Sequence, residues 1–275
     1  MSSQFQPCQS TQETVEIGVG PIQITISVPA QLTSDVLATY KNWLRPGDTG
    51  SEVIHRSTLD VDSSAQWNGR RIQLLTVDQH TSIWRSRPNP ELLGSPRQFC
   101  EHIDKLLRRV IHTAAIYHEG GLIHAAGLVI NGNGWLVPGE SGLGKSTLFT
   151  LLGGLAGGHL HDDLILVFKD RLYAQPSQSS NLALAEAKPA NTPWRGLLFL
   201  SGRSSPIKST RHEFGSKEAT RLLPCFAQDE HQDLEFTLSW FGRMIDVLLD
   251  KNALTLCYDA EVETKDSLVR HLKNL

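Results

Sequence analysis

The chain of 275 residues lacks several features that would place it in a specialised class of protein. No run approaches the roughly 18 consecutive apolar residues of a membrane-spanning helix, so no membrane partner is expected. The N-terminal stretch MSSQFQPCQSTQET is polar and lacks the apolar core of a secretory signal. There is no block of basic residues, and the formal net charge of −3 argues against nucleic acid as a partner.

Cysteine and histidine are present but form no metal-binding pattern. None of the four cysteines stands in a Cys-x-x-Cys pair, and the eleven histidines include no His-x-x-x-His. We therefore predict reduced thiols, no zinc site and a cytoplasmic location. The sequence leaves association of identical chains open.

The first 90 residues predict a β-rich module. The alternating stretch VEIGVGPIQITISV surrounds Gly20-Pro21 and indicates a hairpin. Residues 34–44 predict a short helix with Ser34 as its N-cap, and Asn68-Gly69 indicates a second hairpin. The Pro-rich residues 85–96 suit a linker, so we expect one module at 1–90 and a second domain at 91–275.

The second domain alternates helices and strands. A long helix is expected from Pro96, capped by Ser95 and ended by Gly120-Gly121. The residues NGNG predict a turn between two extended runs. Further strands are expected at 164–168, 182–186, 196–200 and 253–258, and helices at 145–152, 215–224, 232–250 and 264–274. The predicted fold class is α/β (α+β).

The stretch VPGESGLGKSTL carries the clearest chemical signal. It matches G-x-x-x-x-G-K-[ST] at every fixed position, between an expected strand and an expected helix. Glycines there let backbone N–H groups turn toward phosphate oxygens, and the N-terminus of the helix favours anions. Lys145 is the expected partner of the β- and γ-phosphates, and the Ser146 hydroxyl a ligand of Mg²⁺. The predicted ATP-binding residues are Gly139, Glu140, Ser141, Gly142, Leu143, Gly144, Lys145, Ser146 and Thr147.

Two further features bear on phosphoryl transfer. Asp162-Asp163 follow the loop at the edge of an apolar strand, where two carboxylates can divide the tasks of Mg²⁺ ligand and base. The alternative is a solvated turn before the strand. His124 lies on the strand that enters the loop region, either as a core histidine or with its ring bonded to one of the aspartates.

Other phosphate-loop classes fit less well. The ATPases of ABC transporters carry an LSGGQ-like signature and a later apolar strand ending in Asp-Glu, and neither follows this loop. GTPases and small-molecule kinases usually place the loop after their first strand, without a hairpin leading into it.

Residues 124–163 resemble the catalytic domain of HPr kinase/phosphorylase, and more distantly phosphoenolpyruvate carboxykinase. The shared pattern is a histidine on a strand, a turn, a G-[DE]-S-G-x-G-K-S loop, a short helix and an Asp-Asp pair. Weaker similarity in WRGLLFL and RLLPC is to HPr-kinase-like proteins of bacteria, some of which accompany modified-peptide gene clusters. The resemblance implies an ATP- and Mg²⁺-dependent kinase for a serine hydroxyl, with Asp162 as base, Asp163 as Mg²⁺ partner and His124 beside Asp162.

The second signature of that family is altered. Pro193 stands where the family has an acid before its Arg-Gly pair, here Arg195-Gly196. Glu186 is a candidate substitute, and Arg195 is either a substrate contact or a solvated strand end. The change argues against HPr as substrate and against phosphorylase activity.

We therefore expect a kinase acting on a peptide or protein, with the N-terminal module either recruiting the substrate or packing on the kinase domain. One alternative is an ATP-binding regulatory or scaffold protein without phosphotransfer. The other is a kinase for a small-molecule alcohol.

Overall fold

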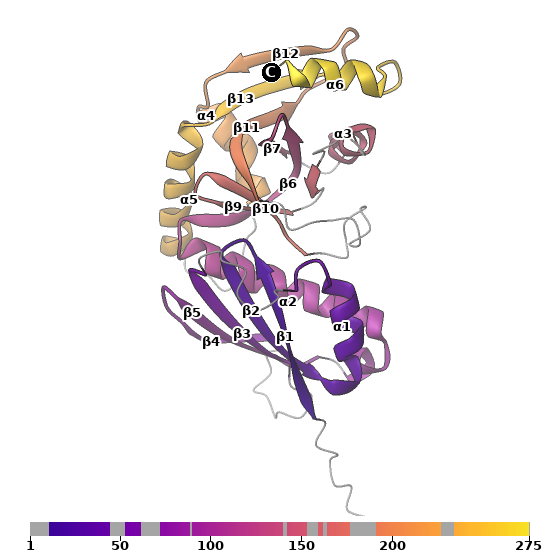
Figure 1. The fold of residues 1–275 in the computed structure, drawn as a ribbon. Coiled ribbons are helices and arrows are strands. Elements are labelled where there is room, and N and C mark those ends of the chain that lie inside the picture. Colours follow the sequence, from indigo (N-terminus) through magenta and orange to yellow (C-terminus); the bar gives the residue numbers. More distant parts are fainter. Residues whose placement is uncertain are drawn as a thin grey trace, which may run out of the picture. The chain divides into compact units, whose positions relative to one another are not determined.

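The structure, a computed structural model, describes residues 11–44, 53–61, 72–88, 90–139, 142–152, 159–161, 164–176, 191–226 and 234–274. It is a mixed α/β protein with two mixed β-sheets, which confirms the predicted class at this level. The chain divides into two compact units, residues 1–110 and 111–275, and the division falls inside helix α2 (Pro96–Ile116) (Figure 1). Within the described ranges, no helix has both the length and the apolar character needed to cross a membrane.

Unit 1 contains a five-stranded sheet with the order β1-β2-β3-β5-β4. Its strands are β1 (Gln12–Val19), β2 (Ile22–Pro29), β3 (His55–Val61), β4 (Ile72–Val77) and β5 (Thr81–Ser86). β1 and β2 are antiparallel with Val19 opposite Ile22, which confirms the predicted hairpin. β2, β3 and β5 are parallel, and β4 runs antiparallel to β5. The predicted turn at Asn68-Gly69 lies outside the described residues.

Helix α1 (Thr33–Tyr40) begins differently from the prediction. Its N-cap is Leu32, no side chain caps it, and Ser34 is the second helical residue. The reason is the 3₁₀ turn η1 (Ala30–Leu32), which runs directly into α1. No residue is left in the extended conformation from which a serine side chain would normally cap a helix.

A buried tyrosine joins α1 to α2 inside unit 1. The Tyr40 hydroxyl contacts the Asp104 carboxylate and lies 3.2 Å from the Cys100 carbonyl. Tyr40 is fully buried, and burial, then the Asp104 charge, raises its pKa well above the ordinary value of 10. The hydroxyl therefore remains a donor at neutral pH.

We expect Tyr40→Phe to destabilise unit 1 by about 1–2 kcal/mol, because the buried carboxylate loses a donor. Urea unfolding at pH 7 measures this. Since the folded pKa of Tyr40 exceeds its unfolded value, the wild type loses stability as the pH rises above 10, and the variant should lose less over that range. Equal stability at pH 7 would contradict the role given to the hydroxyl.

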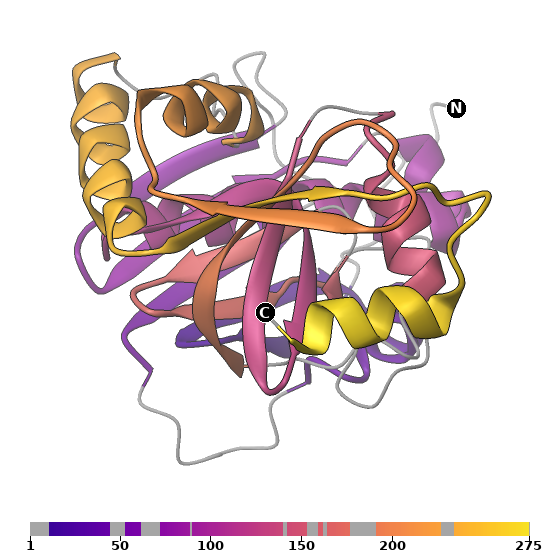
Figure 2. The ribbon, with the colours of Figure 1, turned by 90° about the horizontal axis from the view of Figure 1, so that it is seen from above.

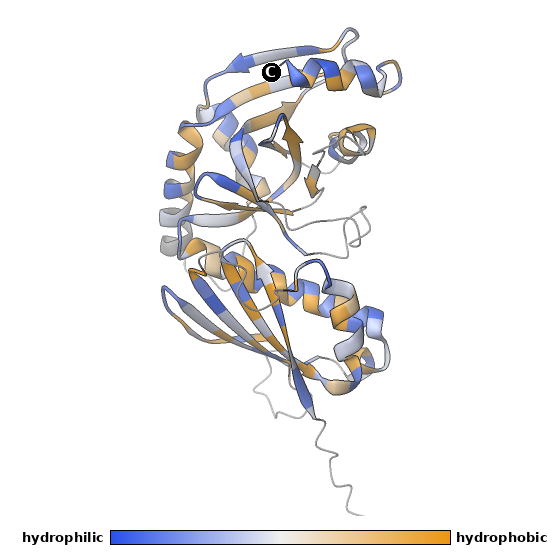
Figure 3. Ribbon diagram, viewed as in Figure 1, coloured by the Kyte–Doolittle hydropathy of each residue, from blue (hydrophilic) through white to orange (hydrophobic). Residues whose placement is uncertain are grey.

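Helix α2 ends earlier than the sequence predicts. It stops at Ile116, and Glu119, with φ of 59°, makes the left-handed turn that the glycine pair was expected to make. Gly120 and Gly121 instead begin β6 (Gly120–Ile130). A Cβ on Gly121 would lie 2.5 Å from Trp240, so the glycine serves close packing. The apolar residues of α2 from Ile103 to Ala114 are buried, and alternating bands mark the helix in Figure 3.

Unit 2 contains an eight-stranded mixed sheet with the main order β10-β9-β6-β7-β11-β13-β12, and β8 pairs with β6. After β6 come β7 (Asn133–Pro138), β8 (His159–His161), β9 (Leu164–Phe168), β10 (Arg171–Ala174), β11 (Asn191–Leu200), β12 (Lys208–His212) and β13 (Asn252–Cys257). β10 pairs with β11 as well as β9, so β9, β6, β7, β11 and β10 form a closed ring of pairings. The strand predicted at 182–186 lies outside the described residues.

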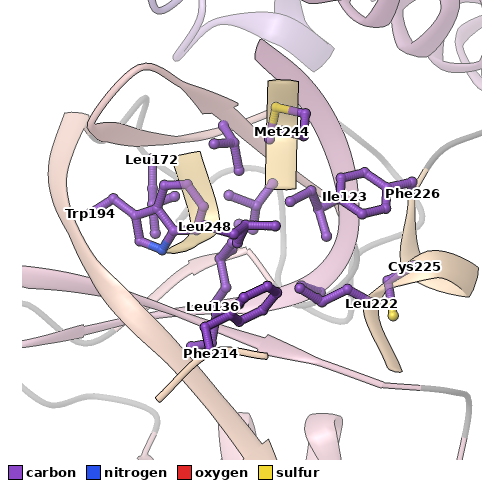
Figure 4. Close-up of a cluster of buried hydrophobic side chains, with 14 of the residues drawn as sticks. Ile123, Leu136, Leu172, Trp194, Phe214, Leu222, Cys225, Phe226, Met244 and Leu248 are labelled. Carbon is purple, nitrogen blue, oxygen red and sulfur yellow. The ribbon is translucent and has the colours of Figure 1, made fainter. Parts of the chain in front are cut away.

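The two faces of this sheet carry separate cores. One core includes Trp194, Phe214 and residues of α4 (Ser216–Leu222), the turn η3 (Leu223–Cys225) and α5 (Leu234–Leu249), as the close-up in Figure 4 shows. The other joins the sheet to α3 (Lys145–Leu152) and α6 (Lys265–Lys273). Figure 2 shows α5 and α6 on opposite sides of the antiparallel pair of strands β12 and β13. The Trp240 indole fixes α5 to the sheet by donating to the Gly120 carbonyl at 2.6 Å.

Candidate functional site

A tight hairpin leads into the phosphate loop, as the residues NGNG predict. Asn131 and Gly132 have φ of 52° and 76°, and Ile130 stands opposite Asn133 where β6 returns as β7. Two successive positive φ angles are typical of the turns that join two-residue hairpins. β7 then ends at Pro138, and the loop begins at the next residue.

Three glycines of the loop adopt backbone conformations that other residues rarely adopt. Gly139, Gly142 and Gly144 have φ of 148°, 88° and 87°. Any side chain at these positions would strain the backbone, so the loop needs its glycines. Glu140 and Ser141 lie outside the described residues.

Lys145 is the first residue of α3 and is buried, with 7% of its surface exposed. Its ammonium donates to the carbonyl oxygen of Gly139, so the side chain reaches from the end of the loop back to its beginning. A buried ammonium that contacts the backbone of the loop is a suitable partner for an anion. Ser146 and Thr147 follow in the first turn of α3, with Thr147 exposed and the Ser146 hydroxyl outside what the structure describes.

The loop lies at the carboxyl edge of three parallel strands. β7, β11 and β13 run in the same direction, so the segments after Pro138, Leu200 and Cys257 leave the sheet at one edge. Ligands of α/β proteins usually bind outside this edge. Tyr258, the residue after β13, donates from its hydroxyl to the Gly144 carbonyl at 3.3 Å.

The segments after β11 and β13 are joined to one another at this edge. Arg203 forms a 3.2 Å ion pair with Glu261, and the Ser205 hydroxyl donates to Glu263 at 3.1 Å. The ion pair is largely exposed, so it contributes little to stability. The contacts nevertheless bring the loop at 201–206 beside the loop at 258–263.

His124 lies in the middle of β6 and is partly buried. It stands opposite Leu164 of β9, while its neighbour Ala125 stands opposite Pro138 of β7. Strand alternation puts His124 on the same face as Ala126 and Leu128, which pack in the core that contains α3. The described backbone therefore places His124 on the face that α3 covers. It is also next to Ala125, which stands opposite Pro138, the last residue before the phosphate loop.

Asp162 and Asp163 lie outside the described residues, but the residues on either side of them are described. His161 stands opposite Gly127 of β6, and Leu164 stands opposite His124 of the same strand.

Arg195 is not brought to the loop. It is exposed and lies in the middle of β11, where Trp194 stands opposite Gly134 and Gly196 opposite Trp135. These are the first residues of β7, at the end of the strand away from Pro138. Glu186 lies outside the described residues. In the part of the chain that the structure describes, no group of three or more His, Cys, Asp or Glu side chains is arranged to hold a metal ion.

Comparison with known proteins found no family model and no curated protein that matches the chain. The loop, its lysine and its position at the sheet edge are therefore the observations that bear on function. Tyr258 was missed by sequence reasoning, because a single tyrosine carries no motif. The signal that was available is its position directly after an apolar strand, where parallel strands present side chains to a ligand.

Proposed function

We propose that the chain is an ATP- and Mg²⁺-dependent kinase that phosphorylates a serine hydroxyl of a peptide or protein. One observation carries the proposal: three glycines with positive φ lead into α3, whose first residue is a buried lysine bonded to the start of the loop. This arrangement provides backbone N–H groups, a helix N-terminus and one cation in a single place. These three elements together favour a nucleotide polyphosphate over other anions.

The acidic pair is the proposed source of acid–base chemistry. We assign Asp162 as the base that accepts the proton of the acceptor hydroxyl, with His124 orienting it. Support comes from the residues next to the pair in the sequence, because His161 pairs with Gly127 and Leu164 with His124 on the strand that precedes the phosphate-loop hairpin. Lys145 would neutralise charge on the transferring phosphoryl group while transfer proceeds in line.

The residues present fit a magnesium ion as part of this site. Hydroxyl and carboxylate oxygens are ligands that Mg²⁺ prefers, and Ser146 in the first turn of α3 with Asp163 would hold it. When bound, the ion neutralises phosphate charge and helps to orient ATP.

The proposed family is that of the HPr-kinase-like proteins, and the proposed substrate class is a peptide or protein, including precursors of modified peptides. HPr itself is not proposed, because Pro193 replaces the acid of the second signature and Arg195 lies away from the loop. Recruitment of substrate by unit 1 stays a prediction. Its strand β4 is at the end of the described sheet and exposes Leu74 and Leu75, which suits pairing with an extended peptide.

The proposal is tested by incubating the protein with γ-labelled ATP, Mg²⁺ and serine-containing peptides, including those encoded beside its gene. We expect label on a peptide. We expect Asp162→Asn to lower the rate of transfer by about 100-fold, because asparagine keeps the shape but cannot accept the proton. Its ATP affinity should stay within a few-fold of wild type, and Asp163→Asn should mainly weaken the effect of Mg²⁺.

The control is Asp170→Asn, which changes an exposed carboxylate in the turn between β9 and β10. Transfer at the wild-type rate by Asp162→Asn would show that the acidic pair is only a turn at a strand edge. Label on a small molecule instead of a peptide would identify an alcohol kinase.

A second candidate function is ATP binding without transfer, as a regulatory or scaffold protein. The position of Arg195 favours it, because this arginine is exposed in the middle of β11, beside Gly134 and Trp135 and not at Pro138, and its expected acidic neighbour is replaced by Pro193. ATP binding by calorimetry with no label transferred to any acceptor would support this alternative.

A further inference from the structure

Tyr258 connects the last strand of the sheet to the phosphate loop. It follows β13 directly, and its contact with Gly144 joins residues that are 114 positions apart in the chain. The ring packs in the core that contains α3 and α6, and only 9% of the residue is exposed. The contact is therefore built into the core of unit 2.

The carbonyl that accepts this bond belongs to the most constrained part of the loop. Gly144 has φ of 87°, and its carbonyl also accepts from the Leu148 amide at 2.8 Å, which opens the hydrogen bonding of α3. Two donors thus hold the peptide group that joins Gly144 to Lys145. A Cβ on Gly144 would lie 3.6 Å from the Tyr258 hydroxyl, so the phenol lies directly against this glycine.

We propose that Tyr258 is a positioning residue of the phosphate loop, whose hydroxyl fixes the Gly144–Lys145 peptide in the orientation that binds phosphate. The inference rests on the proposed nucleotide binding. It assigns Tyr258 to the phosphates and not to the nucleoside, because the observed bond is to the backbone of the loop. Fixing this peptide before the ligand arrives reduces the ordering that binding requires.

The chemistry of the phenol suits a permanent donor. Burial raises the pKa of Tyr258 above its ordinary value of 10, so the hydroxyl keeps its proton over the pH range in which kinases work. Phenylalanine removes this single donor while it retains the ring that fills the core.

The test compares wild type, Tyr258→Phe and Tyr173→Phe by calorimetry with MgATP and with inorganic tripolyphosphate. Tyr173 is a matched control, because it is equally buried but lies in β10. Removing one net hydrogen bond should raise the Kd of Tyr258→Phe by about 2- to 10-fold. The loss should be equal for the two ligands, because both present phosphates to the loop, and Tyr173→Phe should bind like wild type.

Amide hydrogen exchange provides a second readout that needs no ligand. We expect the amides of residues 142–148 to exchange faster in ligand-free Tyr258→Phe, with the rest of unit 2 unchanged. Unchanged exchange in these residues together with a wild-type Kd overturns the inference.

Other results would also decide against it. A loss of affinity for ATP alone would mean that Tyr258 contacts the nucleoside, and an equal loss in Tyr173→Phe would mean that general stability is responsible. If wild type binds neither ligand, the proposed nucleotide site is itself wrong. The proposed function fails if wild type binds no ligand. The inference about Tyr258 fails if wild type binds and Tyr258→Phe binds equally well.

Discussion

Lys145→Ala is expected to weaken MgATP binding by about 30-fold or more. The side chain is 93% buried from solvent and its ammonium bonds to the Gly139 carbonyl, so the cation is already inside the loop when phosphate arrives. Truncating one partner of a buried, charge-assisted pair costs about 2–5 kcal/mol, and each 1.4 kcal/mol is tenfold in Kd. Isothermal titration calorimetry of the two proteins measures the difference.

The control for this experiment is Lys217→Ala, which removes an exposed lysine of α4 in the same unit. It keeps the change in net charge the same and leaves the loop intact. We expect it to bind MgATP like wild type. Unchanged affinity in a folded Lys145→Ala protein would show that the loop does not bind the phosphates of a nucleotide.

Gly196→Ala is expected to destabilise unit 2 by about 3–4 kcal/mol, because the added methyl group has no room. Gly196 lies in β11, between β7 and β13. A Cβ there would be 2.3 Å from the backbone oxygen of Asn252 and 3.0 Å from the Trp135 ring. The closest atom belongs to the neighbouring strand, so relief requires the two strands to separate. Urea unfolding followed by circular dichroism and tryptophan fluorescence measures the loss.

Gly242→Ala is the matched control. Gly242 lies inside α5, and no heavy atom beyond its neighbouring residues and the helix backbone is within 4 Å of the position of a new Cβ. Alanine in a helix interior is favoured over glycine by about 1 kcal/mol, so this variant should be slightly more stable than wild type. If both variants change the free energy of unfolding by the same amount, the close approach of β11 and β13 does not require glycine at position 196.

Local patterns predicted several elements of unit 2 well. Asn131-Gly132 form the expected turn, and α3 begins at Lys145 and ends at Leu152 as predicted. Such features depend on a few adjacent residues, whose conformational preferences are strong enough to predict the local structure from the sequence. The loop glycines belong to this group, because their fixed spacing signals a backbone that needs positive φ.

Features that depend on distant residues could not be predicted. The Gly120-Gly121 pair looks like the end of a helix, but Trp240 requires a small residue there, and nothing near position 120 reveals that contact. The exception is Ser34, whose cause is local: it has the chemistry of an N-cap, but the 3₁₀ turn directly before the helix removes the extended residue that a cap needs. Arg195 matches a signature, yet strand pairing places it in the middle of β11, beside Gly134 and Trp135 and away from Pro138.

The placement of β11 between β7 and β13 also affects how the chain is made on the ribosome. The phosphate loop is synthesised early, but the Tyr258 that contacts it is added 114 residues later. At about 5–20 residues per second, the delay is on the order of ten seconds. During that time α3 and the apolar face of β7 lack their partners from β13 and α6. The nascent chain therefore presents an apolar surface to chaperones until β13 and α6 have emerged.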